Sequence, residues 1–212
     1  MKGFIPIEII VFSMSYATAA IPEAEAFGKN TREATFAGGN FWYLEAVFES
    51  VHGVQDVTTG YAGGNTTRPT YATVQTGATG HAETIDIHYD STQISYEDLL
   101  KVYVESMADP AQTDGQGEDR GSQYKSYIFY RSAAQKKEAE DYLDKVNKSG
   151  RYKGATAIQV VPFTKFYEAE ADNQDYIRRH YDDDYVQKTA LPRLRKFQEE
   201  HPRMIEPDRK IK

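Results

Sequence analysis

The sequence predicts a single α+β domain in which helices pack on a mixed or antiparallel sheet. Its 212 residues suit one domain. Segments with the alternation of strands are interleaved with segments of helical spacing, and their connections leave several antiparallel pairings open. A hydrophobic content of 40% beside 27% charged residues is close to the average for globular proteins, so a packed core is expected.

Five segments have the pattern of strands. The clearest is 81–90, where Ile85 and Ile87 lie on one face and His88 lies on the other. The same alternation places Glu83 on the apolar face. The remaining strands are expected at 34–37, 54–62, 127–130 and 157–161.

Helices are predicted where apolar residues recur at spacings of three and four. The first begins after Asn40, whose side chain favours the N-cap position, and ends at Gly53. Ser95 starts the second with a capping-box-like pattern, and Ser132 caps a charged third helix that runs to about Asn147. Further helical patterns cover 169–180 and 191–200, and long glycine-containing loops are expected at 63–80, a candidate site loop, and at 108–123.

The first twenty residues differ from the rest of the chain. Lys2 precedes an apolar stretch at 9–12 and small residues at 17–20, as in a secretory signal peptide. The sequence therefore predicts a signal peptide over 1–19 and an exported protein, periplasmic or secreted. A leader without structure, or a misplaced start codon, is the alternative. A linker at 20–30, a domain at 31–202 and a polar tail at 203–212 complete the expected organisation.

Composition narrows the possible partners. A net charge of −7 argues against nucleic acid, which proteins bind mainly through lysine and arginine. No stretch is long and apolar enough for a membrane span. His52, His81 and His88 lack the spacing of metal ligands, so neither a metal nor another cofactor is expected. The chain has no cysteine and cannot use a thiol of its own.

Four segments combine glycine, aromatic residues and isolated acids. They read GGNFWY at 38–43, RPTY at 68–71, GATGHAE at 77–83 and GEDRGSQY at 117–124. Together they resemble the methionine sulfoxide reductase A family, whose patterns are G-C-F-W, P-T-Y, G-H-A-E and D-x-G-x-Q-Y. The resemblance spans roughly 31–180 and implies a two-layer α/β plait with a ferredoxin-like core.

The resemblance also implies a chemistry. In that family a thiolate at a helix N-terminus attacks the sulfoxide sulfur. A partly buried acid protonates the sulfoxide oxygen, tyrosine hydroxyls hold it, and an aromatic pair receives the methyl group. A second cysteine then forms a disulfide, which a reductant such as thioredoxin opens.

Most of this machinery has counterparts here. The resemblance assigns the acid to Glu83, the oxygen-holding hydroxyls to Tyr71 and Tyr124, the substrate-orienting carboxylate to Asp119, and the methyl pocket to Phe41 and Trp42. On the apolar face predicted for it, Glu83 would have the raised pKa that the acid requires. Without the resemblance, a structural hydrogen-bond network would explain Glu83, and a turn cap would explain Asp119.

The nucleophile has no counterpart, because its position is Asn40. Tyr43 and Gln75 also stand where members of the family can carry cysteine, and the usual A-E-x-Y-H-Q departs at Asp172 and Asn173. An amide has no nucleophile at neutral pH and cannot cycle through sulfenic acid and disulfide. Asn40 is, however, a better N-cap than cysteine.

Three functions follow from this pattern. The first is a catalytically impaired or inactive member that binds methionine sulfoxide, free or in oxidised proteins, and that cannot form the disulfide thioredoxin would reduce. The second is an active peptide-methionine (S)-S-oxide reductase with an unidentified electron source. The third is a scaffold or interaction protein on the same fold.

Overall fold

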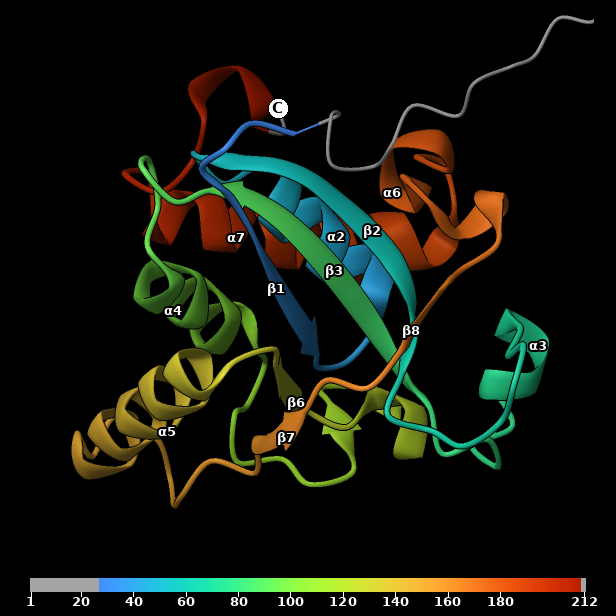
Figure 1. Cartoon of the computed structure of the whole chain (residues 1–212). Coiled ribbons are helices and arrows are strands. Elements are labelled where there is room, and N and C mark those ends of the chain that lie inside the picture. The colour runs from blue at the N-terminus through green and yellow to red at the C-terminus, as the bar shows by residue number, and fades with distance from the viewer. Residues whose placement is uncertain (1–26, 211–212) are drawn as a thin grey trace, which may run out of the picture.

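A six-stranded sheet forms the centre of the computed structural model, which describes residues 27–210 (Figure 1). The predicted signal peptide at 1–19 lies outside the described residues. The strands follow the order β7–β6–β1–β3–β2–β8. Their bounds are β1 (Thr31–Ala37), β2 (Val54–Ala62), β3 (Ala82–Asp90), β6 (Tyr127–Tyr130), β7 (Gln159–Pro162) and β8 (Phe166–Glu168).

The longer helices alternate with these strands. They are α2 (Phe41–Glu49), α4 (Tyr96–Ser106), α5 (Ala133–Lys148) and α7 (Leu191–Glu200), with the one-turn helices α3 (Tyr71–Val74) and α6 (Tyr176–Arg179). The short strands β4 (Gly115–Gln116) and β5 (Asp119–Arg120) pair with each other. Three-residue 3-10 turns lie at Ser122–Tyr124, Ala171–Asn173 and Pro207–Arg209, and a π-helix lies at Val186–Ala190.

The core topology is β1-α2-β2-β3-α4-β6, with the spatial order β6–β1–β3–β2. This is the arrangement of a ferredoxin-like plait. Its strands are antiparallel, and β7 adds a parallel pairing to β6, which makes the sheet mixed. The predicted α+β fold is confirmed.

One face of the sheet packs against helices, and α2 and α7 lie behind β2 and β3 in Figure 1. Phe36 of β1 shows how the layers meet. Its ring stacks on Tyr103 of α4 at a centroid distance of 4.8 Å and lies 5.7 Å from the ring of Phe48 of α2. Ile85 and Ile87 of β3 are fully buried, as their alternation predicts. Burial of apolar surface on this face holds the two layers together.

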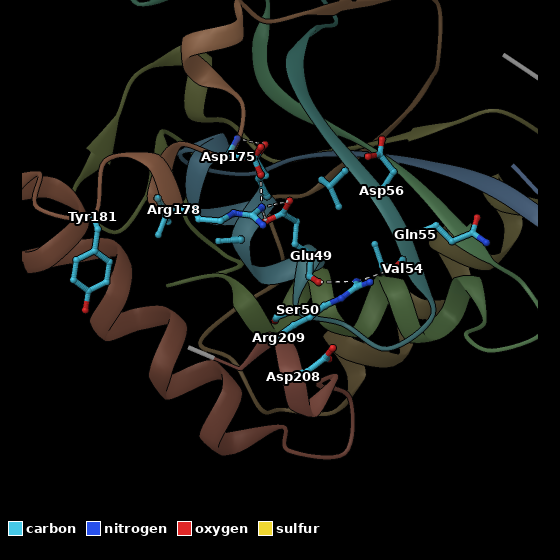
Figure 2. A pocket seen from close by; sticks show the side chains of 14 residues that line it. Glu49, Ser50, Val54, Gln55, Asp56, Asp175, Arg178, Tyr181, Asp208 and Arg209 are labelled. Atoms are coloured by element: carbon cyan, nitrogen blue, oxygen red, sulfur yellow. Dashed lines mark hydrogen bonds and ion pairs between the residues drawn. The ribbon is translucent and has the colours of Figure 1, made fainter. Parts of the chain in front are cut away.

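The end of the described chain packs back onto α2. Ile205 is 6% exposed and forms an isolated bridge with Val51. Arg209 donates from Nη1 to the carbonyl oxygens of Glu49 and Val54, both at 3.0 Å, at the C-terminal end of α2 (Figure 2). The packed part of the chain therefore extends beyond the boundary expected at residue 202.

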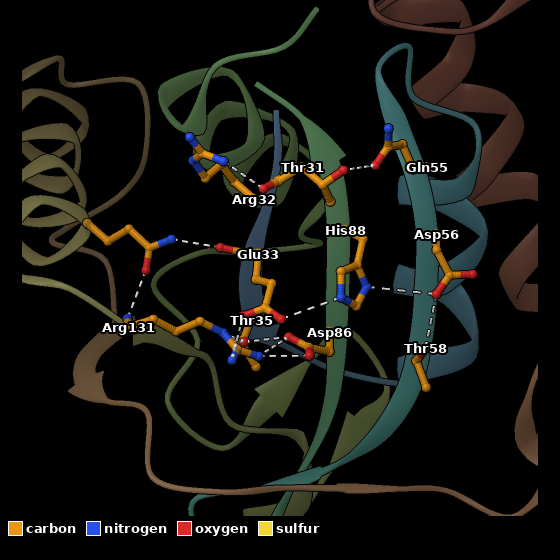
Figure 3. Close-up of polar contacts among 11 residues, drawn as sticks. Thr31, Arg32, Glu33, Thr35, Gln55, Asp56, Thr58, Asp86, His88 and Arg131 are labelled. Carbon is orange, nitrogen blue, oxygen red and sulfur yellow. Dashed lines mark hydrogen bonds and ion pairs between the residues drawn. The ribbon is translucent and has the colours of Figure 1, made fainter. Parts of the chain in front are cut away.

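The other face of the sheet has a small apolar cluster around Phe129 and a polar region, and Figure 3 shows the ion pairs of the polar region. The Arg131 guanidinium donates to both carboxylate oxygens of Asp86, at 2.6 and 2.7 Å. His88 lies between Glu33 and Asp56, with N···O distances of 3.5 and 3.9 Å. Asp86 and His88 alternate with the buried isoleucines of β3, so the predicted alternation is confirmed.

The helix predicted over 169–180 is wrong for most of its length. Only α6 is α-helical there, after the 3-10 turn at Ala171–Asn173, because the side chains before α6 bind other elements. Glu170 accepts hydrogen bonds from Tyr61 and Tyr71, and Gln174 bonds to the backbone of Thr59. Asp175 has φ of 54°, which is not helical. The other predicted helices form close to their expected bounds, while the strand expected at 157–161 forms two residues later.

Candidate functional site

The site is built around the first turn of α2. Asn40 is its N-cap, as predicted, and its Oδ1 accepts a hydrogen bond from the Trp42 N–H at 2.9 Å. The residue is only 4% exposed. Gly39 precedes it with φ of 81°, and a Cβ at this position would lie 2.8 Å from Gln116 Cβ. Glycine therefore permits Gln116 of β4 to lie close against the turn between β1 and α2.

Glu83 lies next to this turn and is fully buried. Its Oε2 accepts from the Phe41 N–H at 3.0 Å, and its Oε1 accepts from Gln75 Nε2 at 2.5 Å. Burial raises the pKa of Glu83 from its usual 4.5 to about 8, and the nearby Asp119 carboxylate adds to the rise. The two hydrogen bonds oppose it only in part. At neutral pH Glu83 can therefore carry a proton and donate it.

Two tyrosines lie beside this acid. The Tyr124 hydroxyl donates to Gln75 Oε1 at 3.0 Å. Burial and, after it, the Glu83 carboxylate raise the pKa of Tyr124 to about 12. Burial and the Glu83 carboxylate also raise the pKa of Tyr71. Both hydroxyls therefore stay protonated and can donate hydrogen bonds to an oxygen placed near Glu83.

Asp119 completes the polar side of the site. Its Oδ2 is buried and has no hydrogen-bond partner among the described residues. Burial raises the pKa of Asp119, while the Arg193 guanidinium, 4.0 Å away, and the Asn40 N–H lower it. A buried acceptor without a hydrogen bond is costly for the fold. Asp119 Oδ2, which forms the 4.0 Å ion pair but no hydrogen bond among the described residues, is therefore a candidate for binding a ligand donor.

Aromatic rings form the apolar side. Phe41 is fully buried, and its ring stacks on Tyr71 at 6.1 Å. Trp42 is 9% exposed and stacks on Tyr71 at 5.5 Å. The residues assigned from the motifs thus come together as one cluster, from α2, α3, β3, β5 and the turn Ser122–Tyr124.

A family model described as peptide methionine sulfoxide reductase matches residues 32–205. The chain belongs to this family. The peptide methionine sulfoxide reductase MsrA 2 of Synechocystis sp. is 45% identical over 173 residues, which cover 82% of this chain and 81% of that protein. The peptide methionine sulfoxide reductase MsrA of Thermus thermophilus is 40% identical over 174 residues, 82% of this chain and 97% of its own.

Solved structures of the family have the same fold. Methionine sulfoxide reductase A of Corynebacterium diphtheriae superposes with a TM-score of 0.64 at 29% identity, over 73% of this chain and 77% of that one. Mxr1 of Saccharomyces cerevisiae in its reduced form gives a TM-score of 0.65 at 25% identity, over 73% and 88% of the two chains.

Three residues of the cluster were not found by sequence reasoning. Tyr176 stacks on Trp42 with a centroid distance of 3.6 Å, and Asn173 accepts a hydrogen bond from Trp42 Nε1 at 3.2 Å. Tyr185 meets Trp42 edge-on at 5.9 Å, and its buried hydroxyl has no partner among residues 27–210. Burial, followed by the nearby Asp119 carboxylate, raises the pKa of Tyr185. For the two tyrosines, the density of tyrosine between 176 and 185 was the only signal in the sequence, whereas Asn173 stands in the segment that matches A-E-x-Y-H-Q.

A hollow with a volume of ≈ 520 Å³ lies at the other end of α2 (Figure 2). Glu45 and Glu49 line it from α2, and Arg178 lines it from α6. None of the motif residues contributes to it. The hollow and the motif residues therefore lie at different ends of the helix.

No group of three or more metal-ligating side chains occurs in the part of the chain that the structure describes. Over the same residues, no helix is both long enough and apolar enough to cross a membrane.

Proposed function

We propose that this chain is a non-catalytic member of the family that binds methionine sulfoxide, free or in oxidised proteins. One observation carries the proposal: a buried acid, two tyrosine hydroxyls and an aromatic pocket surround Asn40, where the family motif has its nucleophile. The binding groups are present, and the thiol is absent from all 212 residues.

Three sets of contacts support binding. Protonated Glu83 donates to the sulfoxide oxygen, which is a strong acceptor. Tyr71 and Tyr124 donate to the same oxygen from the side. The methyl group then packs on Phe41 and Trp42. These contacts orient the ligand with its sulfur toward the start of α2, where Asn40 lies.

The same geometry argues against reduction. Converting a sulfoxide to a sulfide takes two electrons and two protons and releases water. Glu83 can supply a proton, but the Asn40 amide supplies no electrons and forms no sulfenic acid. The Asn40 side chain is also engaged in capping α2.

Titration calorimetry with an N-acetyl methionine S-sulfoxide amide tests the proposal. We expect saturable binding, and none with the matched unoxidised methionine amide, which lacks the oxygen that Glu83 and the tyrosines bind. Absence of binding at millimolar sulfoxide would remove this function.

Family membership favours one alternative, an active reductase with an electron source outside the chain. Turnover of a methyl sulfoxide with dithiothreitol or thioredoxin distinguishes the two. We expect none above the protein-free blank, and clear turnover by the purified wild-type chain would replace our proposal.

We also propose that the protein is exported, on the basis of the signal-peptide pattern at residues 1–19. Intact-mass measurement of the protein from its native host tests this: we expect a mature chain that begins at Ala20. A chain retaining Met1 would contradict it.

A further inference from the structure

The side chain of Gln75 joins the two groups that would hold a sulfoxide oxygen. Its Nε2 donates to Glu83 Oε1 at 2.5 Å, and its Oε1 accepts from the Tyr124 hydroxyl at 3.0 Å. The amide of Gln123 adds weaker contacts, at 3.4 Å to Oε1 and 3.5 Å to the Gln75 carbonyl. The carboxamide is therefore a bridge between the acid and the hydroxyl.

These contacts engage the same groups that would bind a sulfoxide ligand. A tyrosine hydroxyl has a single proton to donate, and that of Tyr124 goes to Gln75. Of the two oxygens of Glu83, Oε2 accepts from the Phe41 N–H and Oε1 accepts from Gln75. While this bridge stands, a sulfoxide oxygen cannot receive a hydrogen bond from Tyr124, and Oε1 of Glu83 is already bonded to Gln75.

The carboxamide also resembles the ligand chemically. Its carbonyl oxygen and a sulfoxide oxygen are both strong acceptors at the end of a polar double bond, and Tyr124 can donate to either. The difference lies at Glu83, which accepts from the Gln75 N–H but has to donate to a sulfoxide. Exchange of one for the other therefore requires Glu83 to hold a proton.

We propose that Gln75 is a built-in latch, whose carboxamide occupies the sulfoxide-oxygen position and has to turn out before a ligand binds. The proposal rests on the sulfoxide-binding function proposed above. It adds that the free protein is predominantly in a closed form, which lowers its apparent affinity by the fraction of open molecules.

The backbone around Gln75 suits a side chain that turns. Gln75 is the C-cap of the four-residue helix α3 and is half-buried, so solvent borders it. Gly77, two residues on, has φ of 72° and ends the turn. Glu83, by contrast, is fully buried on the central strand β3. The Gln75 side chain is therefore the part of the bridge that can leave.

The test compares sulfoxide binding by the wild-type chain and by Gln75→Ala. Removing the carboxamide frees Glu83 and Tyr124, so we expect the variant to bind the N-acetyl methionine S-sulfoxide amide about tenfold more tightly. Gln159→Ala is the matched control, because Gln159 is exposed on β7, and its affinity should equal that of wild type.

The possible outcomes distinguish a failure of the latch from a failure of the proposed sulfoxide binding. Equal or weaker binding by Gln75→Ala, with binding by wild type, overturns the latch and leaves the proposed function intact. Binding by neither protein overturns the proposed function, and the latch with it.

A second measurement uses the wild-type chain and does not depend on a variant that folds. The side-chain amide signal of Gln75 in ¹⁵N NMR should shift when the sulfoxide saturates the protein, while that of Gln159 should not. A Gln75 signal unchanged at saturation would overturn the latch.

Discussion

The two ends of α2 both carry buried carboxylates, but only one end has groups left to bind a ligand. At the N-terminal end the pKa of Glu83 is raised to about 8, and at the C-terminal end burial raises those of Glu45 to about 8 and Glu49 to about 7. A perturbed acid alone therefore does not identify the site, since structural networks perturb pKa values too.

The difference lies in the partners. At the C-terminal end Arg178 donates to both oxygens of Glu49 and also contacts Asp175, and the Asp175 N–H donates to Glu45 (Figure 2). At the N-terminal end Asp119 Oδ2 has no hydrogen-bond partner among the described residues and only a 4.0 Å ion pair with Arg193, and Glu83 is bonded to a side chain that can turn away. Carboxylates that accept hydrogen bonds from within the protein support the fold, whereas a carboxylate oxygen without such a bond can accept one from a ligand.

The largest expected effect is a gain of activity at the N-terminal end. Asn40→Cys places a thiol at the start of α2, beside the proton donor Glu83, so the first reductive step should return. We expect turnover with dithiothreitol about a hundredfold above the protein-free blank, measured as sulfide formed. Asn40→Ser is the control and should stay inert. A folded Asn40→Cys protein without turnover would show that the pocket no longer supports the reaction.

The second largest effect is expected from the aromatic rings that pack at the N-terminal end of α2. Trp42→Ala removes a buried ring that stacks on both Tyr71 and Tyr176. It should lower the free energy of unfolding by about 3 kcal/mol. Urea denaturation followed by circular dichroism measures this, because Trp42 is the single tryptophan and fluorescence would be lost with it. A loss below about 1 kcal/mol would show that the ring is not part of the packed core.

The buried acids should behave alike in stability and differently in binding. Between pH 4.5 and about 8 the folded state keeps the proton of Glu83, which the unfolded chain releases. Stability therefore falls as the pH rises through this window. Glutamine does not titrate, so Glu83→Gln removes this fall in the free energy of unfolding. The variant should be more stable than wild type by roughly 2 kcal/mol at pH 8. Glu45→Gln should do the same at the other end, and unfolding free energies at pH 5 and pH 8 test both.

Sulfoxide binding then distinguishes these two acids. Above about pH 8 wild type loses the Glu83 proton, so its affinity should fall by up to tenfold per pH unit. Glu45→Gln should retain that dependence and Glu83→Gln should abolish it. A pH profile that both variants share would mean that Glu83 does not donate to the ligand.

The smallest effect is expected from the ion pairs at the C-terminal end. The Arg178 side chain is 68% exposed, and its bonds to Glu49 are therefore screened by solvent. Arg178→Ala should lower the free energy of unfolding by less than about 1 kcal/mol and leave sulfoxide affinity unchanged. A loss of affinity would place the hollow within the binding site.

Much of the candidate site was predictable because its signals are local. The N-cap at Asn40 follows from one residue before an apolar stripe, and the burial of Glu83 follows from the alternation along β3. The four motifs also occur along this chain in the order of the family. The helix predicted over 169–180 failed for the opposite reason: Glu170 and Asn173 bond to Tyr61 and Trp42, 109 and 131 residues away.

By itself, the sequence determined the alternation of strands and helices, the family motifs and the absence of any thiol. Each of these depends on neighbouring residues or on composition. Only the tertiary structure decided that Tyr176 and Tyr185 join the aromatic pocket, that Arg178 donates to the Glu49 carboxylate at the far end of α2, and that Gln75 bridges Glu83 and Tyr124. Periodicity reports which face a side chain takes, but a partner on another element is set by how the elements pack.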